Sequence, residues 1–215
     1  MYKVVLFDLD GTIVDPVVGI TNSIIHAFKK YNMEVKDRSE LLKFIGPPLA
    51  DSFQEFYGFS KEKAWEAMGF YREYYSVKGV FENTLYDGIE EMLKTLKEHG
   101  YVIGLATSKP EPFARLIIES FNLTKYFDYI AGASFDDSRH QKEQVVEYAL
   151  QTLNVTNPSE ALMVGDRKFD VIGARINNMD CVGVLYGYGS EEELQEANAK
   201  YIVKTPQDII NLLCK

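Results

Sequence analysis

Short apolar runs rich in branched residues recur along this 215-residue chain, with longer amphipathic stretches between them. The runs span residues 3–7, 102–106, 129–131, 161–164, 181–185 and, more weakly, 201–203. Buried parallel strands have this composition, and parallel strands need a long crossover, usually a helix, between them. The alternation therefore predicts an α/β fold built on a parallel sheet.

The stretch 87–100 carries a helical pattern between two of these runs. Its apolar residues repeat at three- and four-residue spacing, Asp87 is placed to cap the helix, and Gly100 is placed to end it. The same spacing over 143–153 and 207–215 predicts two further helices.

Residues 17–83 differ, because they offer several helical patterns and no strand pattern. We interpret them as an all-helical cap inserted into an α/β core of residues 1–16 and 84–215, with linkers near 15–16 and 83–84. Aromatic side chains of the insertion are expected to pack in its interior rather than to contact a ligand. They include Trp65, Phe70, Tyr71, Tyr74 and Tyr75.

The charge balance narrows the range of partners. Acidic residues number 32 against 23 basic ones, a net charge of -9, which disfavours nucleic-acid polymers and membrane surfaces.

No run of about 18 apolar residues and no signal-peptide pattern occurs, so we expect a cytoplasmic protein. Cys181 and Cys214 are too few for a disulfide framework and are read as reduced thiols. A monomer and a homodimer both remain open.

Two carboxylates follow the first apolar run directly, in the sequence VVLFDLDGT. A parallel strand delivers its last residues to the carboxyl edge of the sheet, where ligands of open α/β sheets bind. Asp8 and Asp10 are costly together there unless a cation neutralises them. The alternative reading is an acidic turn with a helix cap, and the motif alone leaves both open.

A second polar segment ends the next apolar run, in GLATSKP, residues 104–110. Thr107 and Ser108 offer hydroxyls and backbone N–H groups to a phosphate, although such residues equally often cap helices. Lys109 follows them. Lys142 stands near the start of a predicted helix, where most single lysines are merely solvated.

The last polar segment is VGDRKFD, in which Asp166 follows an apolar run and Asp170 lies one helical turn further. This spacing lets one carboxylate ligate a metal while the other supports it. The four segments together supply a nucleophile, an acid, oxyanion donors, a cation and a metal site, which phosphoryl transfer through a carboxylate requires.

The ordered set DLDGT, TSK, Lys142 and GDRKFD resembles the haloacid dehalogenase superfamily over nearly the whole chain. The insertion resembles the helical cap of its phosphoglycolate-phosphatase and β-phosphoglucomutase branch. The segments FIGPPL, MVGDRKFDVIGA and GVLYGYGSEEEL are similar to a bacterial subgroup that is phosphoglycolate phosphatase-like or 5'-nucleotidase-like. The resemblance implies a doubly wound, Rossmann-like parallel sheet and a phosphatase that uses Mg²⁺ on a small phosphate ester.

By that resemblance Asp8 is the nucleophile, and Asp10 is the acid that protonates the leaving alcohol and then activates water. Thr107 would hydrogen-bond the phosphoryl oxygens, and Lys142 would neutralise Asp8 and the phosphate. One departure from the family pattern is Glu143, which follows the lysine where many relatives have a proline.

The resemblance also implies binding residues. The metal would be held by Asp8, the main-chain carbonyl of Asp10, Asp166 and, in support, Asp170. The substrate would be bound by Leu9 and Ser108 through their backbone N–H groups, by Lys109, and by Gly46 and Pro47 of the cap. We expect the IGPPL segment to belong to a mobile lid that selects the leaving group, the alternative being a rigid turn between helices.

Three other classes of protein share parts of this set of residues. A receiver domain uses a similar set of residues, but its order differs and the chain is too long for one receiver. A dehalogenase has no need of Asp10. A phosphomutase shares every core residue and stays open, as does the choice among phosphoglycolate, a nucleoside monophosphate and a sugar phosphate.

Overall fold

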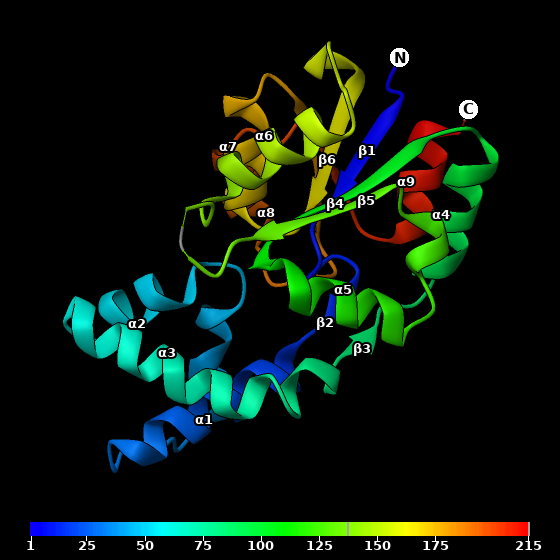
Figure 1. The fold of residues 1–215 in the computed structure, drawn as a ribbon. Coiled ribbons are helices and arrows are strands. Elements are labelled where there is room, and N and C mark those ends of the chain that lie inside the picture. Colours follow the sequence, from blue (N-terminus) through cyan, green and yellow to red (C-terminus); the bar gives the residue numbers. More distant parts are fainter. Residues whose placement is uncertain (137, 215) are drawn as a thin grey trace. The chain divides into compact units, whose positions relative to one another are not determined.

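The computed structural model describes residues 1–136 and 138–214. The chain divides into two compact units (Figure 1), which we call the core unit, Met1–Asp15 and Leu85–Lys215, and the helical unit, Pro16–Thr84.

The core unit is built on a six-stranded sheet in which every neighbouring pair of strands is parallel. In spatial order the strands are β5 (Tyr129–Ala133), β4 (Val102–Pro110), β1 (Val4–Phe7), β6 (Ala161–Gly165), β7 (Asp180–Val184) and β8 (Tyr201–Val203). From β1 the chain builds β4 and β5 on one side and then crosses to build β6, β7 and β8 on the other. The predicted doubly wound parallel sheet is confirmed, and the carboxyl ends of β1, β4 and β6 are adjacent, where ligands of such sheets bind.

Helices follow most strands of the core unit. They are α4 (Ile89–Glu98), α5 (Glu111–Ser120), α6 (Lys142–Thr152), α7 (Lys168–Ile176), α8 (Glu191–Glu196) and α9 (Pro206–Leu213), with short 3₁₀ turns η3 (Thr124–Tyr126) and η4 (Pro158–Glu160). The last residue of the helix predicted over 207–215, Lys215, lies outside the described residues.

The predicted capping of α4 is wrong at its start. Gly88, with φ 83°, occupies the N-cap position, and no side chain caps the helix there. The helix therefore begins one residue too late for Asp87 to be its cap. Gly100 lies just beyond the end of the helix with φ 82°, a conformation that glycine adopts without strain.

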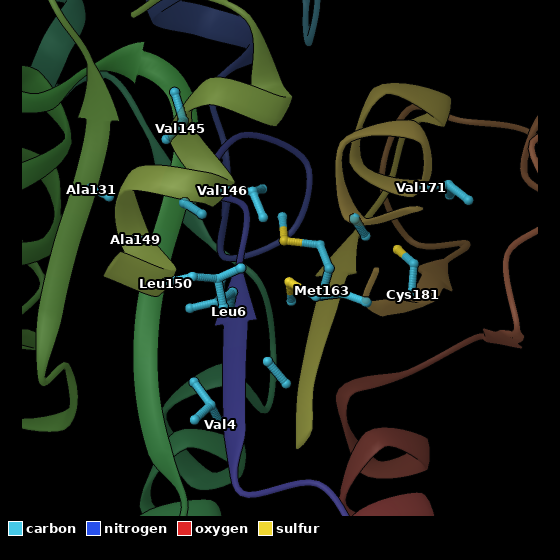
Figure 2. Packing of buried hydrophobic residues seen from close by; sticks show 14 of the residues in the cluster. Val4, Leu6, Ala131, Val145, Val146, Ala149, Leu150, Met163, Val171 and Cys181 are labelled. Atoms are coloured by element: carbon cyan, nitrogen blue, oxygen red, sulfur yellow. The ribbon is translucent and has the colours of Figure 1, made fainter. Parts of the chain in front are cut away.

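The core of this unit explains why the strand sequences are apolar throughout. Leu6 and Met163 point into a cluster with Val146 and Ala149 of α6 and Val171 of α7 (Figure 2). The alternate residues of the same strands are also fully buried, so both faces of the sheet are covered. A sheet covered on both faces gives continuous hydrophobic runs rather than alternation.

The helical unit contains α1 (Val17–Lys30), η1 (Arg38–Phe44), α2 (Leu49–Tyr57), α3 (Lys61–Tyr75) and η2 (Gly79–Phe81). Residues 17–83 are all described and contain no strand. The chain passes between the two units through β2 (Val14–Asp15) and β3 (Thr84–Leu85), which pair with each other in a two-stranded sheet.

The interior of the helical unit is aromatic. Phe28, Phe44 and Phe53 are buried with ring centroids 5.2–6.5 Å apart. Tyr71 and Tyr75 are also buried, with their rings stacked 5.1 Å apart, as expected from the sequence. The other three aromatic residues expected inside, Trp65, Phe70 and Tyr74, are only half-buried. Their positions on α3 place them at the edge of its packed face.

Both cysteines are free thiols, Cys181 in the sheet core and Cys214 half-buried after α9. Across the described residues, the helices are all too short or too polar to cross a membrane.

Candidate active site

Asp8 lies at the carboxyl end of β1 and is 5% exposed. Its backbone N–H donates to the carbonyl of Val164 at 2.9 Å, which ties the end of β1 to β6. Gly11 turns the chain back at φ 83°, and a Cβ there would stand 2.1 Å from Oδ2 of Asp166. Only glycine therefore permits both the turn and the close approach of the second acidic segment.

Lys142 connects the carboxyl ends of β1 and β4 with the first turn of α7 through its ammonium group. Nζ lies 2.7 Å from Oδ1 of Asp8 and 2.7 Å from Oδ1 of Asp170, and it donates to the carbonyl of Ala106 at 2.9 Å. The lysine is the first residue of α6, although Glu143 rather than a proline follows it. Burial alone would lower the pKa of Lys142, but the two carboxylates outweigh burial and raise it, so the side chain stays charged.

Three buried carboxylates meet beside this lysine. One oxygen each of Asp8, Asp166 and Asp170 lies within 4.8 Å of the others. Oδ2 of Asp166 accepts the backbone N–H of Tyr188 at 2.8 Å, while Oδ1 is buried without a hydrogen-bond partner. Oδ2 of Asp170 accepts the backbone N–H of Arg167 at 3.0 Å, at the start of α7.

This acidic trio carries more negative charge than the protein neutralises. Burial first, and then the charges of Asp170 and Asp8, raise the pKa of Asp166 well above its ordinary value. Burial raises the pKa of Asp170 to about 6, opposed by Lys142 and reinforced by Asp8. A hard divalent cation prefers carboxylate oxygens, and Asp166 offers an orphaned one. The donor set therefore fits Mg²⁺.

The end of β4 departs from regular pairing where the polar segment begins. The register with β5 shifts between Thr107 and Pro110, so Ser108 and Lys109 are left out of the regular ladder. Such irregularities re-aim side chains, and here Nζ of Lys109 reaches Oδ2 of Asp10 at 2.7 Å. The N-cap of α5 is Pro110 without a side-chain cap bond, so Thr107 and Ser108 do not cap that helix.

Asp10 is the second carboxylate of the strand-end pair, and its side chain is 13% exposed. Burial raises the pKa of Asp10, although Lys109 opposes the shift. Oδ1 of Asp10 is buried and has no hydrogen-bond partner. One oxygen is thus fixed by a lysine while the other can meet a donor or give a proton to a ligand.

The remaining candidate residues lie in two places. Leu9 is buried, and its carbonyl accepts the N–H groups of residues 12–14, which closes the turn after β1. Gly46 and Pro47 belong to the helical unit, between η1 and α2. Gly46 has φ 108°, which by itself requires glycine, and Pro48 is the N-cap residue of α2. Contact of this segment with a substrate stays a prediction.

Sequence reasoning missed two contacts. The pairing of Lys109 with Asp10 depends on the register shift in β4, which has no local sequence signal. The bond from Tyr188 to Asp166 depends on the loop after β7, residues 185–190, whose two closely spaced glycines hinted at a close backbone approach.

A model of the haloacid dehalogenase-like hydrolases matches residues 5–184 of the chain. A curated relative from Pseudomonas aeruginosa, a 5'-nucleotidase, is 42% identical over 90% of this chain and 87% of its own. The tyrosine-protein kinase PtkA of Mycobacterium tuberculosis is 38% identical over 93% of this chain and 68% of its own.

Solved structures agree with this match. A protein described as a predicted phosphatase from Clostridium acetobutylicum is 47% identical and superposes with a TM-score of 0.97, over 100% of this chain and 99% of that one. A haloacid dehalogenase-like hydrolase from Streptococcus pneumoniae is 32% identical with a TM-score of 0.91, over 98% of both chains. The ordered strand-end motifs, the parallel sheet and these similarities lead to one assignment: the chain belongs to the haloacid dehalogenase-like hydrolase family.

Proposed function

We propose that this chain is a magnesium-dependent phosphatase that hydrolyses a small phosphomonoester through an aspartyl-phosphate on Asp8. The observation that supports the proposal is that two different lysines contact the two carboxylates. Lys142 contacts Asp8, and Lys109 contacts Asp10, each at 2.7 Å. Two carboxylates that stand side by side are thereby given different surroundings, as a nucleophile and an acid require.

In the first step a carboxylate oxygen of Asp8 bonds to phosphorus while the ester P–O bond breaks. Protonated Asp10 gives its proton to the leaving oxygen, and burial of Asp10, which raises its pKa, favours that protonated form. We assign to Lys142 and the hydroxyl of Thr107 the role of stabilising the charge that develops on the phosphoryl oxygens.

In the second step Asp10, now a carboxylate, takes a proton from water. The water oxygen attacks phosphorus and the bond to Asp8 breaks, which releases phosphate and restores the Asp8 carboxylate and the protonated Asp10. We assign both proton transfers to Oδ1 of Asp10, since Oδ2 is held by Lys109 and Oδ1 has no hydrogen-bond partner.

Asp8, the main-chain carbonyl of Asp10, Asp166 and Asp170 would hold Mg²⁺. When bound, the ion offsets the negative charge of the trio and of the phosphate. Removal of the metal by a chelator should abolish turnover, and Mg²⁺ should restore it, whereas Ca²⁺, with its larger and looser coordination, should inhibit.

For the substrate we propose the nucleoside 5'-monophosphate class, ahead of phosphoglycolate. The support is the 42% identity with a 5'-nucleotidase over 90% of this chain. Two structures described as predicted or putative phosphoglycolate phosphatases are 22% and 21% identical to this chain, which shows the fold alone.

The test is a panel of nucleoside 5'-monophosphates, phosphoglycolate, a hexose phosphate and pyrophosphate, assayed with Mg²⁺ by phosphate release and compared by kcat/KM. The Asp8→Asn variant prepared in parallel controls for contaminating phosphatases. A preference for nucleotides of at least about tenfold, equivalent to about 1.4 kcal/mol, supports the proposal. Phosphate transferred between positions of the sugar without release would instead indicate a mutase.

A further inference from the structure

The loop that follows β7, residues 185–190, packs against Asp166 of the acidic trio. We call it the Tyr-Gly loop. A Cβ on Gly187 would stand 2.3 Å from the carbonyl oxygen of Gly11 and 2.4 Å from Cβ of Asp166. A Cβ on Gly189 would stand 1.9 Å from the carbonyl oxygen of Asp166. Both glycines are therefore required for the loop to lie directly on the metal-site carboxylate.

The two tyrosines of the loop contact β2 and residues near β2 and β3, the strands through which the chain leaves and re-enters the core unit. The hydroxyl of Tyr188 donates to Oδ1 of Asp15, the last residue of β2. The hydroxyl of Tyr186 donates to the carbonyl of Thr12 at 3.1 Å, and its ring packs edge-on against Tyr86, with centroids 5.1 Å apart.

Tyr86 follows β3 directly and donates its backbone N–H to the carbonyl of Ile13 at 3.2 Å. The outgoing and returning segments are thus bonded to each other and to the same loop. All of these residues belong to the core unit.

Tyr188 contacts both Asp166 and Asp15. Its backbone N–H donates to Oδ2 of Asp166 at 2.8 Å, and its side chain binds Asp15. Burial, and then the hydrogen bond to Asp15, raise the pKa of the Tyr188 hydroxyl, so it remains a donor at neutral pH. Movement of β2 would therefore displace Tyr188, whose backbone N–H orients Asp166.

We infer that Tyr188 is a positioning residue that couples metal binding at Asp166 to the order of β2 and β3, the two strands that carry the helical unit. Metal binding fixes Asp166, the Tyr-Gly loop and Asp15 together. By linkage, ordered connecting strands strengthen metal binding by the same factor. The inference rests on the proposed metal site and adds to it a means by which the connecting strands respond to the metal.

The test uses Tyr188→Phe, which deletes the hydroxyl and leaves the backbone bond to Asp166. The matched control is Tyr2→Phe, because the Tyr2 hydroxyl also donates to a carboxylate, Asp180, at 2.5 Å. Tyr2 and Asp180 lie at the amino-terminal edge of the sheet, opposite the site. Two readouts need no catalysis: Mg²⁺ titration by calorimetry, and amide hydrogen exchange over residues 13–16 and 84–86.

Tyr188→Phe should raise the Mg²⁺ dissociation constant about 3- to 10-fold, less than the 10- to 100-fold typical when a direct partner of a metal ligand is lost. Amides of 13–16 and 84–86 should exchange more slowly when Mg²⁺ is added to the wild type, and this protection should shrink in the variant. Tyr2→Phe should leave both readouts unchanged. Adding Asp15→Ala to Tyr188→Phe should weaken Mg²⁺ binding no further than either single change.

Unchanged Mg²⁺ affinity in Tyr188→Phe, with normal protection, would overturn the coupling while leaving the metal site intact. An equal loss in Tyr2→Phe would reduce the effect to general stability and overturn it too. Failure of the wild type to bind Mg²⁺ at all would remove both the proposed metal and this inference.

Discussion

The two units of this molecule bury different kinds of polar side chain. Among the described residues, every buried charged side chain belongs to the core unit: Asp8, Lys109, Lys142, Asp166 and Asp170. The buried polar residues of the helical unit are the hydroxyl-bearing Thr21, Ser23 and Ser52, each of which donates to a carbonyl four residues earlier.

This difference distinguishes polar side chains that are buried for a reaction or a ligand from those that are buried by helix packing. Buried charges cost several kcal/mol unless they are paired, and they persist where a reaction or a ligand needs them. Hydroxyls that bond to their own helix cost little and report only on packing. We therefore expect the proposed reaction in the core unit, and any role of the helical unit in substrate choice to come from its surface.

The largest effect is expected at Asp8. Asp8→Asn should lower kcat by more than about a thousandfold, because a neutral amide does not attack phosphorus, while the fold is retained. Steady-state kinetics and circular dichroism on the same preparation check this. Residual activity above about a thousandth of wild type would argue that Asp8 is not the nucleophile.

The next effect compares a buried ion pair with an exposed one. Lys109→Met keeps the length of the side chain but leaves Asp10 without its partner, so kcat/KM should fall about 10- to 100-fold and stability by about 3 kcal/mol. The matched control in the helical unit is Lys30→Met, which breaks an exposed pair with Glu73 at 3.1 Å and should cost at most about 1 kcal/mol with activity intact. Equal losses of unfolding free energy for Lys109→Met and Lys30→Met, measured in urea, would contradict the distinction between the units.

A smaller and selective effect is expected in the helical unit. Gly46 is a poor probe because its φ of 108° makes any substitution strained. Pro47→Ala avoids that strain, and if the segment selects the leaving group, kcat/KM should fall unevenly, by about 3- to 10-fold for the best natural substrate and less for p-nitrophenyl phosphate. A uniform change, or none, would leave the segment as a turn between helices.

The smallest effect concerns pH and stability without metal. Burial raises the pKa of Asp170 to about 6, against an ordinary value of 3.8. Ionisation of this carboxyl therefore costs more free energy in the folded protein than in the unfolded chain. The cost of ionisation is absent below about pH 3.8 and complete above about pH 6. Stability of the metal-free protein should therefore fall as pH rises through that window.

Asp166→Asn removes one charge from the trio and keeps an oxygen that accepts the Tyr188 N–H. In the presence of a chelator it should raise Tm by about 2–6 °C near pH 8 and by less near pH 5. Differential scanning calorimetry across this range checks it, and addition of Mg²⁺ should stabilise only the wild type. A lower Tm for the variant at high pH would show that the trio is not repulsive.

Much of this fold was predictable because it rests on composition. The apolar runs became the strands of the sheet, since both of its faces are buried. Local geometry was less predictable: Asp87 does not cap α4, because Gly88 takes the cap position. The bond between Lys109 and Asp10 was out of reach, because it follows from a register shift between two strands.

The sequence by itself determined where the strands begin, that Asp8 and Asp166 follow two of them and that Thr107 lies near the end of a third, because a parallel sheet brings all its carboxyl ends to one edge. Only the tertiary structure decided which charges meet there. Lys142 reaches Asp8 across 134 residues of sequence, a contact that the family resemblance implied and that no local pattern of residues predicts. That contact depends on the spatial order of the strands and on the start of α6, which are set by packing of the whole core and leave no local pattern to read.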